Sequence, residues 1–233
     1  MFDLDPTTWL QMVLRFIHFL AGITWIGILY FFNLVNVPTM KALDAATKGK
    51  VVPELMPRAL FWFRWGALFT WLSGFIYFAW IIIGEQGAHS AILIWLVGWV
   101  VAWGIIFGLL QPVSGALNKG MVLGIIVAVL VLVIGVVLIQ GVGGGLPTSR
   151  SKAIAVGGGL GTIMLLNVWG IIWPHQKRII AWTRESAEKG TPMPPEAAKM
   201  VRRAFLASRM NTWLSIPMLW FMGAASHFPM FGG

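Results

Sequence analysis

Long apolar stretches, separated by short polar segments, constrain this sequence more than any other feature. Crossing about 30 Å of hydrocarbon takes about 20 residues of helix, and each stretch approaches or exceeds that length. A composition of 58% hydrophobic and 11% charged residues is also typical of a chain that lies mostly in lipid. We therefore predict one domain over residues 1–233, an all-α integral membrane protein in contact with the lipid bilayer. Its bundle of about six transmembrane helices is expected at residues 8–37, 60–84, 91–110, 121–140, 154–173 and 210–230.

Local signals predict some helix ends and helix contacts. Asp5 followed by Pro6 is typical of an N-cap with proline in the first turn. Pro38 and Pro174 are expected to end the first and fifth spans, because proline cannot donate a backbone hydrogen bond. GxxxG spacings, which allow close approach of helices, occur at 104–108, 120–124 and 157–161.

The positive charges lie almost entirely in the first, third and fifth connections between the spans. Since cytoplasmic loops carry the excess of Lys and Arg, we assign these connections to the cytoplasmic side, with a basic segment at about 175–208. The opposite side has only Arg150 and Lys152, so both termini are predicted to face outward, to the periplasmic side. Because topology accounts for the net charge of +9, we expect no nucleic-acid partner.

The chain has no cysteine, and this excludes several cofactors. Iron–sulfur clusters, thiolate metal sites and a covalently attached c-type haem all need cysteine ligands. The sequence also lacks HExxH, GxSxG and a carboxylate cluster, so a stand-alone hydrolase is not expected. Any redox chemistry in this chain must therefore use other ligands.

Two histidines are candidate ligands of a b-type haem. His18 lies inside the first span and His227 lies near the outer end of the last, so both belong to the outer half of the bilayer. There they could face one another as axial ligands of the iron. Arg15 shares a helix face with His18 and is a candidate partner for a haem propionate, since no span contains an acidic residue. Alternatively, His18 hydrogen-bonds to a neighbouring helix and His227 lies in the membrane interface.

The other polar residues of the spans have simpler interpretations. His175 lies beside Lys177 and Arg178, a setting that suits a lipid phosphate. A haem on the inner side, between His175 and Met210, is a less favoured alternative. His89 is expected to be solvated in a short outer loop, and Arg64 to extend toward the headgroups. Four asparagines are expected to form interhelical hydrogen bonds: Asn33, Asn36, Asn167 and Asn211.

Three stretches carry a family resemblance. The first, Arg15-Phe-Ile-His18-Phe-Leu-Ala-Gly22-Ile-Thr-Trp25-Ile-Gly27, is similar to an RWLHxxxGxxWIG pattern. The second, Trp62-Phe-Arg-Trp65 with Thr70-Trp71-Leu-Ser-Gly74-Phe75, is similar to WFKW and TWLSGF. The third, Asn211-Thr-Trp213-Leu-Ser-Ile-Pro217 with Ser226-His227-Phe-Pro229, is similar to NNYLTLP and SNHYP. In these stretches the chain resembles the membrane-embedded N-terminal domain of the bacterial membrane-bound urate oxidase (urate hydroxylase) family.

The resemblance implies an oxidoreductase in a bacterial inner (cytoplasmic) membrane. Family members join this domain to a C-terminal cytochrome c, and this sequence has no CxxCH motif. We therefore expect an external cytochrome or other redox partner, together with other membrane subunits. His18 and His227 match pattern histidines of the family. The family's histidine just before NNYLT is replaced by Met210, which either ligates haem or marks a lost site.

The sequence thus favours a membrane electron-transfer subunit that holds a b-type haem between its first and last helices. A haem-free accessory subunit of a larger respiratory or photosynthetic complex is the first alternative. Oxidation of urate or another purine by this chain is the second. Transport is less favoured, because the two halves share no repeat with broken helices.

Overall fold

The computed structural model describes residues 5–112, 115–141 and 146–231, and these ranges contain helices and no strand. Two of the helices are continuous through a π-helical segment. One joins α1 (Pro6–Tyr30), η1 (Phe31–Asn36) and α2 (Val37–Ala42), and the other joins α6 (Ser149–Asn167), η3 (Val168–Ile172) and α7 (Trp173–Lys189). The remaining elements are α3 (Ala45–Gln86), α4 (His89–Leu109), the short 3-10 helix η2 (Gly115–Asn118), α5 (Gly120–Gly141) and α8 (Ala197–Ala224). The predicted all-α class is confirmed.

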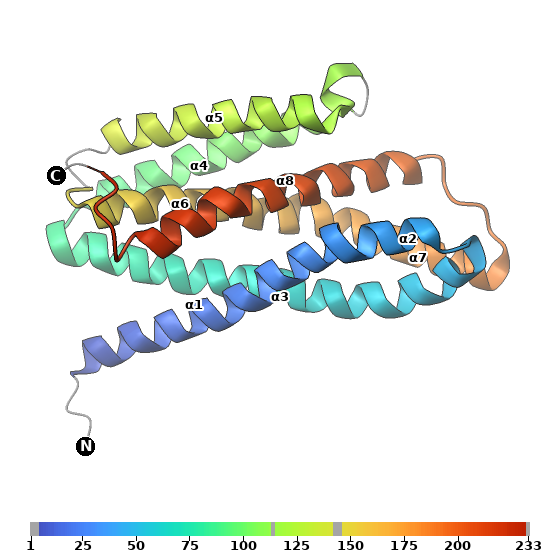
Figure 1. The fold of residues 1–233 in the computed structure, drawn as a ribbon, viewed down its shortest axis with the longest axis horizontal. Helices are drawn as coiled ribbons and strands as arrows, with labels where there is room; N and C mark the ends of the chain where they lie inside the picture. The colour runs from blue at the N-terminus through green and yellow to red at the C-terminus, as the bar shows by residue number, and fades with distance from the viewer. Residues whose placement is uncertain (1–4, 113–114, 142–145, 232–233) are drawn as a thin grey trace.

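The long helices lie side by side and alternate in direction along the chain (Figure 1). The start of α1 and the end of α8 lie at the same end of the bundle. Four helices in the described residues are long and apolar enough to cross a membrane: Pro6–Ala42, His89–Leu109, Gly120–Gly141 and Ser149–Lys189. α3 and α8, which contain the other two predicted spans, have 42 and 28 residues and are not among the four helices found in the described residues.

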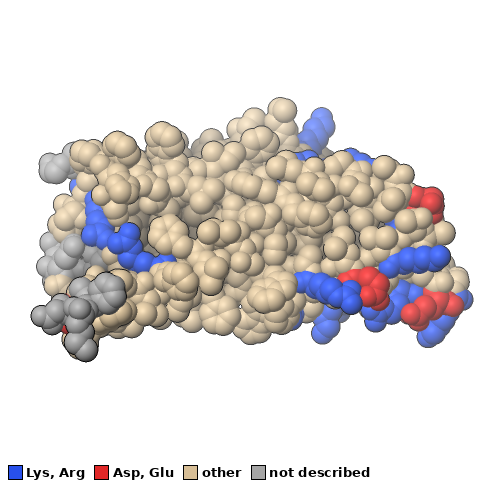
Figure 2. Space-filling view, turned by 60° about the horizontal axis from the view of Figure 1, so that its bottom comes forward, with Lys and Arg blue, Asp and Glu red and all other residues tan. Residues whose placement is uncertain are grey.

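Charged side chains gather near the ends of the face shown in Figure 2, and the wide middle band has almost none. We call the end with more of them the basic end. It carries the connection between α2 and α3, the start of α5 and the connection between α7 and α8. This distribution matches the expected apolar belt with polar margins.

The N-terminal cap is confirmed. The Asp5 carboxylate accepts hydrogen bonds from the backbone N–H groups of Thr7 and Thr8, at 2.9 and 3.0 Å, and Pro6 lies in the first turn of α1. Such a cap satisfies backbone donors that have no partner within the helix.

The predicted helix ends at Pro38 and Pro174 are wrong, because the helix continues through both prolines. Each proline is the second residue after a π-helical segment, in the first turn of α2 or α7. A proline ring clashes with the carbonyl one turn earlier and leaves it without a donor. The wider π turn changes this pairing, so the helix passes the proline without ending.

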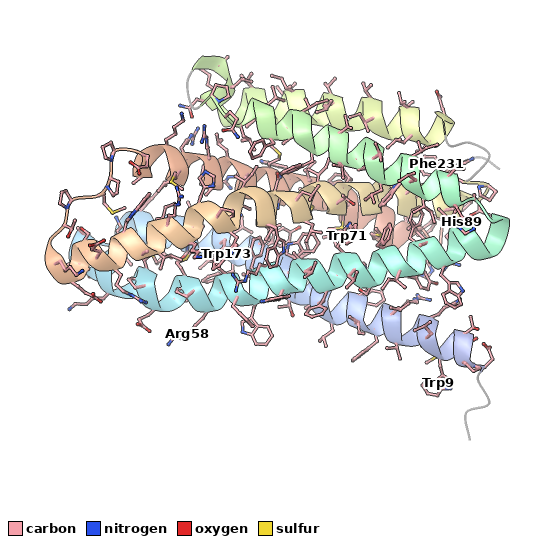
Figure 3. All side chains as sticks on the ribbon, turned by 180° about the vertical axis from the view of Figure 1, so that it is seen from behind. Trp9, Arg58, Trp71, His89, Trp173 and Phe231 are labelled. Atoms are coloured by element: carbon pink, nitrogen blue, oxygen red, sulfur yellow. The ribbon has the colours of Figure 1, made fainter. Side chains whose placement is uncertain are left out.

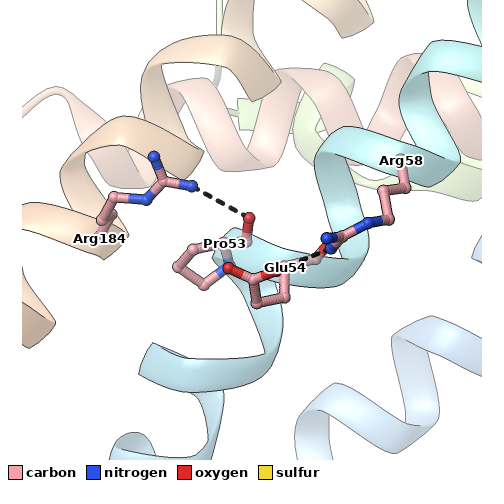
Figure 4. A network of polar contacts seen from close by, with 4 residues as sticks. All are labelled: Pro53, Glu54, Arg58 and Arg184. Atoms are coloured by element: carbon pink, nitrogen blue, oxygen red, sulfur yellow. Dashed lines mark hydrogen bonds and ion pairs between the residues drawn. The ribbon is translucent and has the colours of Figure 1, made fainter.

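At the basic end, α3 begins well before the predicted span and is tied to α7. The carbonyl of Pro53, a proline inside α3, accepts a hydrogen bond of 3.3 Å from Arg184 of α7 (Figure 4). One turn later Arg58 pairs with Glu54 at 2.8 Å, and this hydrogen bond lowers the pKa of the Glu54 carboxyl. The predicted polar loop before residue 60 is therefore largely helical.

α6 is the most deeply buried helix of the bundle and packs between α3, α4 and α8. At Gly159 an added Cβ would lie 1.9 Å from Cε2 of Trp99, so only glycine allows α4 this close. Of the predicted GxxxG contacts, the one that begins at Gly157 is confirmed, because its Cβ position lies 3.1 Å from Met222 of α8. Gly104, Gly108 and Gly124 have no neighbour within 4 Å of that position.

Gly159→Ala is expected to lower the free energy of unfolding by roughly 1–3 kcal/mol, since the buried Trp99 ring must move. Gly161→Ala, two residues away, is the control, because an added Cβ there meets nothing within 4 Å. Unfolding followed by circular dichroism in detergent measures both. Equal stability of the two variants would contradict this account of the α4–α6 contact.

Candidate functional site

His18 is held by α3 through one ring nitrogen. Its Nδ1 lies 2.8 Å from the backbone carbonyl oxygen of Thr70. Because a carbonyl can only accept, Nδ1 must carry the proton, and in the neutral ring Nε2 then keeps its lone pair. The predicted hydrogen bond to a neighbouring helix is therefore confirmed. A ligating histidine uses its second nitrogen in the same way, so this bond is compatible with metal ligation.

Gly74 makes the space that the His18 ring occupies. A Cβ at this position would lie 2.7 Å from Cε1 and 2.8 Å from Nδ1 of His18, but 3.8 Å from Nε2. Together Thr70 and Gly74 form a seat for the ring, which we call the His18 seat. Both residues belong to the second stretch of the family resemblance, whereas His18 belongs to the first.

α1 and α8 meet near the middle of the bundle and diverge from there, and we call the divergent halves the α1/α8 fork (Figure 1). The meeting point is marked by Tyr30–Ser215 and Asn33–Ser208 hydrogen bonds, both 2.9 Å long. His18 and Arg15 lie on the α1 arm. The fork therefore lies between the first and last helices, where the sequence places the haem.

The surface of the fork is apolar and open. Phe19 and Ile23 on α1 are 62% and 72% exposed, and Trp220 on α8 is 71% exposed. A shallow pocket lies where the helices meet, lined by Tyr30, Ile216, Pro217, Leu219 and Trp220. The bundle itself leaves this surface uncovered.

His227 and Arg15 are both exposed. His227 lies in the turn after α8, where its backbone N–H donates to the Ala224 carbonyl at 2.9 Å. The contacts described for His18 are with α3 and do not include His227. The start of α1 and the end of α8 lie at the same end of the bundle (Figure 1), and none of the contacts described for the two histidines joins their rings.

The less favoured ligands, His175 and Met210, have their own local partners. Nδ1 of the half-buried His175 lies 2.6 Å from the Ile171 carbonyl oxygen, one turn earlier in the same helix. Met210 is buried in α8, and its Sδ accepts a hydrogen bond from Asn167 at 3.7 Å. The contacts described for the two residues do not join them.

The expected interhelical hydrogen bonds are confirmed for all four asparagines, including Asn33, which donates to Ser208, and Asn36, which donates to the Sδ of Met56 at 3.8 Å. Asn167 donates to the Oδ1 of Asn211 at 2.8 Å, and Asn211 donates to the Met164 carbonyl at 3.0 Å. Trp103 of α4 donates to the Oδ1 of Asn167 at 3.1 Å. Asn167 and Asn211 are both fully buried, and the network links α4, α6 and α8.

Arg64 lies against aromatic rings, which the sequence interpretation missed. Its guanidinium carbon lies 3.8 Å from the centre of the Trp173 ring, with Trp169 and Phe61 about 2 Å further away. Trp169 also donates to the Arg64 carbonyl at 3.2 Å. In the sequence Arg64 stands among aromatic residues, which could have indicated such contacts. The ring that lies closest to it in space, Trp173, is more than one hundred positions further along the chain. Figure 3 shows Trp173 inside the bundle, and His89 at the end opposite Arg58.

His89 begins α4 instead of lying in a loop, and it is exposed as expected. No group of three or more His, Cys, Asp or Glu side chains that could hold a metal ion occurs in the described ranges. A haem needs only one or two axial side chains, so among the candidates His18 has the arrangement that best fits a ligand.

The comparisons with known proteins identify one family. A family model described as urate oxidase N-terminal matches residues 42–233. The match includes the second and third stretches of the resemblance, with the His18 seat and His227, and begins after Arg15 and His18. No curated protein and no solved structure gives a significant match.

The buried asparagine network yields a test of its own. Asn167→Leu and Asn211→Leu each leave an amide without its partner, whereas the double variant removes both. We expect a coupling energy of about 0.6–1.7 kcal/mol in a double-mutant cycle of unfolding in detergent. Additive effects of the two single substitutions would contradict a direct interaction.

Proposed function

Because this chain belongs to the urate oxidase N-terminal family, as the match over residues 42–233 shows, we propose that it is a membrane electron-transfer subunit. It holds a b-type haem through His18, with His227 as the second axial ligand, at the α1/α8 fork. An external cytochrome or another redox protein exchanges electrons with it. The subunit spans a bacterial inner membrane with six helices, and both of its termini face the periplasm.

The arrangement of His18 is the observation that carries this proposal. Thr70 fixes the tautomer and the ring orientation, since its carbonyl oxygen lies 2.8 Å from Nδ1. The Nε2 lone pair is then available, and Gly74 keeps the ring close to α3 without covering Nε2. A ligand pre-oriented in this way loses little conformational freedom when it binds iron. The residues present therefore fit one axial position of a haem.

The fork supplies the surroundings that such a cofactor needs. Its exposed aromatic and aliphatic side chains, such as Phe19 and Trp220, offer apolar contact to a porphyrin. Arg15, one turn before His18, is a cation suited to a propionate. No salt bridge to Arg15 occurs in the described residues. Bound haem supplies a one-electron carrier, while the chain positions it and excludes water.

The distribution of charge supports the proposed orientation. The basic end carries most Lys and Arg residues, and cytoplasmic segments hold such an excess. His227 lies at the opposite end, so a haem bound there is within reach of a periplasmic redox partner. An even number of long helices supports our proposal that both termini face that side.

A haem-free accessory subunit is the second candidate. It is favoured by large exposed aromatic side chains, for example Trp62 and Trp213, which suit packing against other membrane subunits. The two candidates differ in one property that is easily measured, the presence of bound haem.

His18→Ala is expected to abolish the haem that co-purifies with the protein, because the oriented axial ligand is lost. His89→Ala, at the exposed start of α4, should retain it. A reduced-minus-oxidised spectrum with pyridine haemochrome quantification measures the content in gentle detergent. Full haem in the His18 variant would refute the ligand assignment, and a folded wild-type protein without haem would favour the accessory subunit. Bleaching by urate would support purine oxidation instead.

Gly74→Ala tests the His18 seat without removing the ligand. The added methyl group forces the ring away from Thr70, so haem affinity should fall about tenfold. Gly22→Ala is the matched control, because its Cβ position lies at an ordinary 3.6 Å from Thr70. Haem titration of both variants separates them, and unchanged affinity in Gly74→Ala would show that the seat does not orient the ligand.

A further inference from the structure

An apolar groove runs between α5 and α8, away from the His18 seat. It encloses about 370 Å³, with α5 and α8 as walls and Val156 and Leu160 of α6 at its floor. α5 and α8 run in the same direction, so the groove extends from the basic end toward Phe221 and Phe231 (Figure 1). The bundle leaves it open to its surroundings.

The described hydrogen bonds hold α8 to the start of α5 at the basic end, and the groove opens beyond that point. At the basic end Arg202 of α8 donates to the side-chain oxygen of Asn118 at 2.7 Å, just before α5 begins. Along the wall of α5, Gly120, Gly124 and Ala128 stand one turn apart and present little side chain. Gly124 has nothing within 4 Å of its Cβ position.

The shape of the groove selects a hydrocarbon chain. From Arg209 to Phe221 it follows 12 residues of α8, or about 18 Å at the helical rise. Apart from Arg209, the side chains that line it are apolar, so its occupant must be apolar over this length. An empty apolar space would forfeit the dispersion contacts of its lining. In a bilayer the available filler of this width is an acyl chain.

Arg209 gives the groove a positively charged end. It lines the groove, is half-buried, and lies beside the Phe205 ring at 5.5 Å. The neighbouring Arg202 and Arg203 donate to Asn118 and to the Gln111 carbonyl oxygen, but Arg209 has no salt bridge among the described residues. A guanidinium at this depth suits a phosphate. We propose that the α5/α8 groove binds one anionic phospholipid, with an acyl chain along α5 and its phosphate on Arg209.

Native mass spectrometry of the full chain tests this assignment. Delipidated protein is titrated with phosphatidylglycerol or with phosphatidylcholine of the same acyl chains. We expect one preferred phosphatidylglycerol adduct, and Arg209→Gln should weaken it about fivefold, as expected for one interfacial cation. Arg209→Lys should retain most of the preference. Gly124→Leu should reduce the adducts of both lipids, because the side chain fills the groove.

Two substitutions serve as controls. Arg58→Gln removes a cation at the basic end outside the groove, and Gly104→Leu adds the same bulk to an open position of α4. Both should bind phosphatidylglycerol as the wild type does, and all variants must elute as single, helical species. The proposal would be overturned if Arg209→Gln bound phosphatidylglycerol as well as the wild type, or if Gly124→Leu left lipid binding unchanged. It would also be overturned if the protein formed a dimer that protects the groove from lipid.

Discussion

In hydrocarbon a polar group must find its partner inside the bundle, and this requirement organises the structure. Asn167 meets it through Asn211, Trp103 and Met210, and these bonds connect α6 to α4 and α8. Because Gly159 of α6 has no side chain, the Trp99 ring of α4 packs directly against α6. α1 and α5 pack at the periphery of the bundle. The two open apolar features, the α1/α8 fork and the α5/α8 groove, both border α8. α8 therefore takes part in the buried hydrogen-bond network and also forms one side of both open surfaces, the α1/α8 fork and the α5/α8 groove.

His18 obeys the same requirement in a different way. Its Nδ1 is satisfied by Thr70, yet the bond leaves the second nitrogen without a described partner. In water such a lone pair would cost nothing, but in a bilayer it is unfavourable unless a ligand binds it. Asn167, whose amide is fully paired, completes the bundle, whereas His18 is the residue that we propose completes a cofactor site. This contrast is the physical basis for assigning haem binding to α1.

The sequence predicted what depends on composition and on local chemistry. The helical class, the Asp5 cap and the family follow from residues that lie near one another in the chain or recur in a pattern. That the asparagines form interhelical hydrogen bonds follows from their polar side chains in apolar spans, although the sequence did not identify their partners. The predicted helix ends at Pro38 and Pro174 were wrong, because a π-helical turn before each proline lets the helix continue. Such a turn has no clear signal in the sequence. Thr70 as the partner of His18, and Trp173 as the partner of Arg64, join residues far apart in the chain. A single sequence contains no record of such pairs.

The central claim is that His18 and His227 together hold a b-type haem at the fork. Electron paramagnetic resonance of the oxidised protein tests it most directly, because the spin state of ferric haem reports the number of strong axial ligands. The account predicts a low-spin signal in the wild type, and a high-spin signal in His227→Ala, where His18 alone remains. A low-spin signal that survives loss of His227 would contradict the assignment of the second ligand. The absence of any haem signal in folded wild-type protein would contradict the claim as a whole.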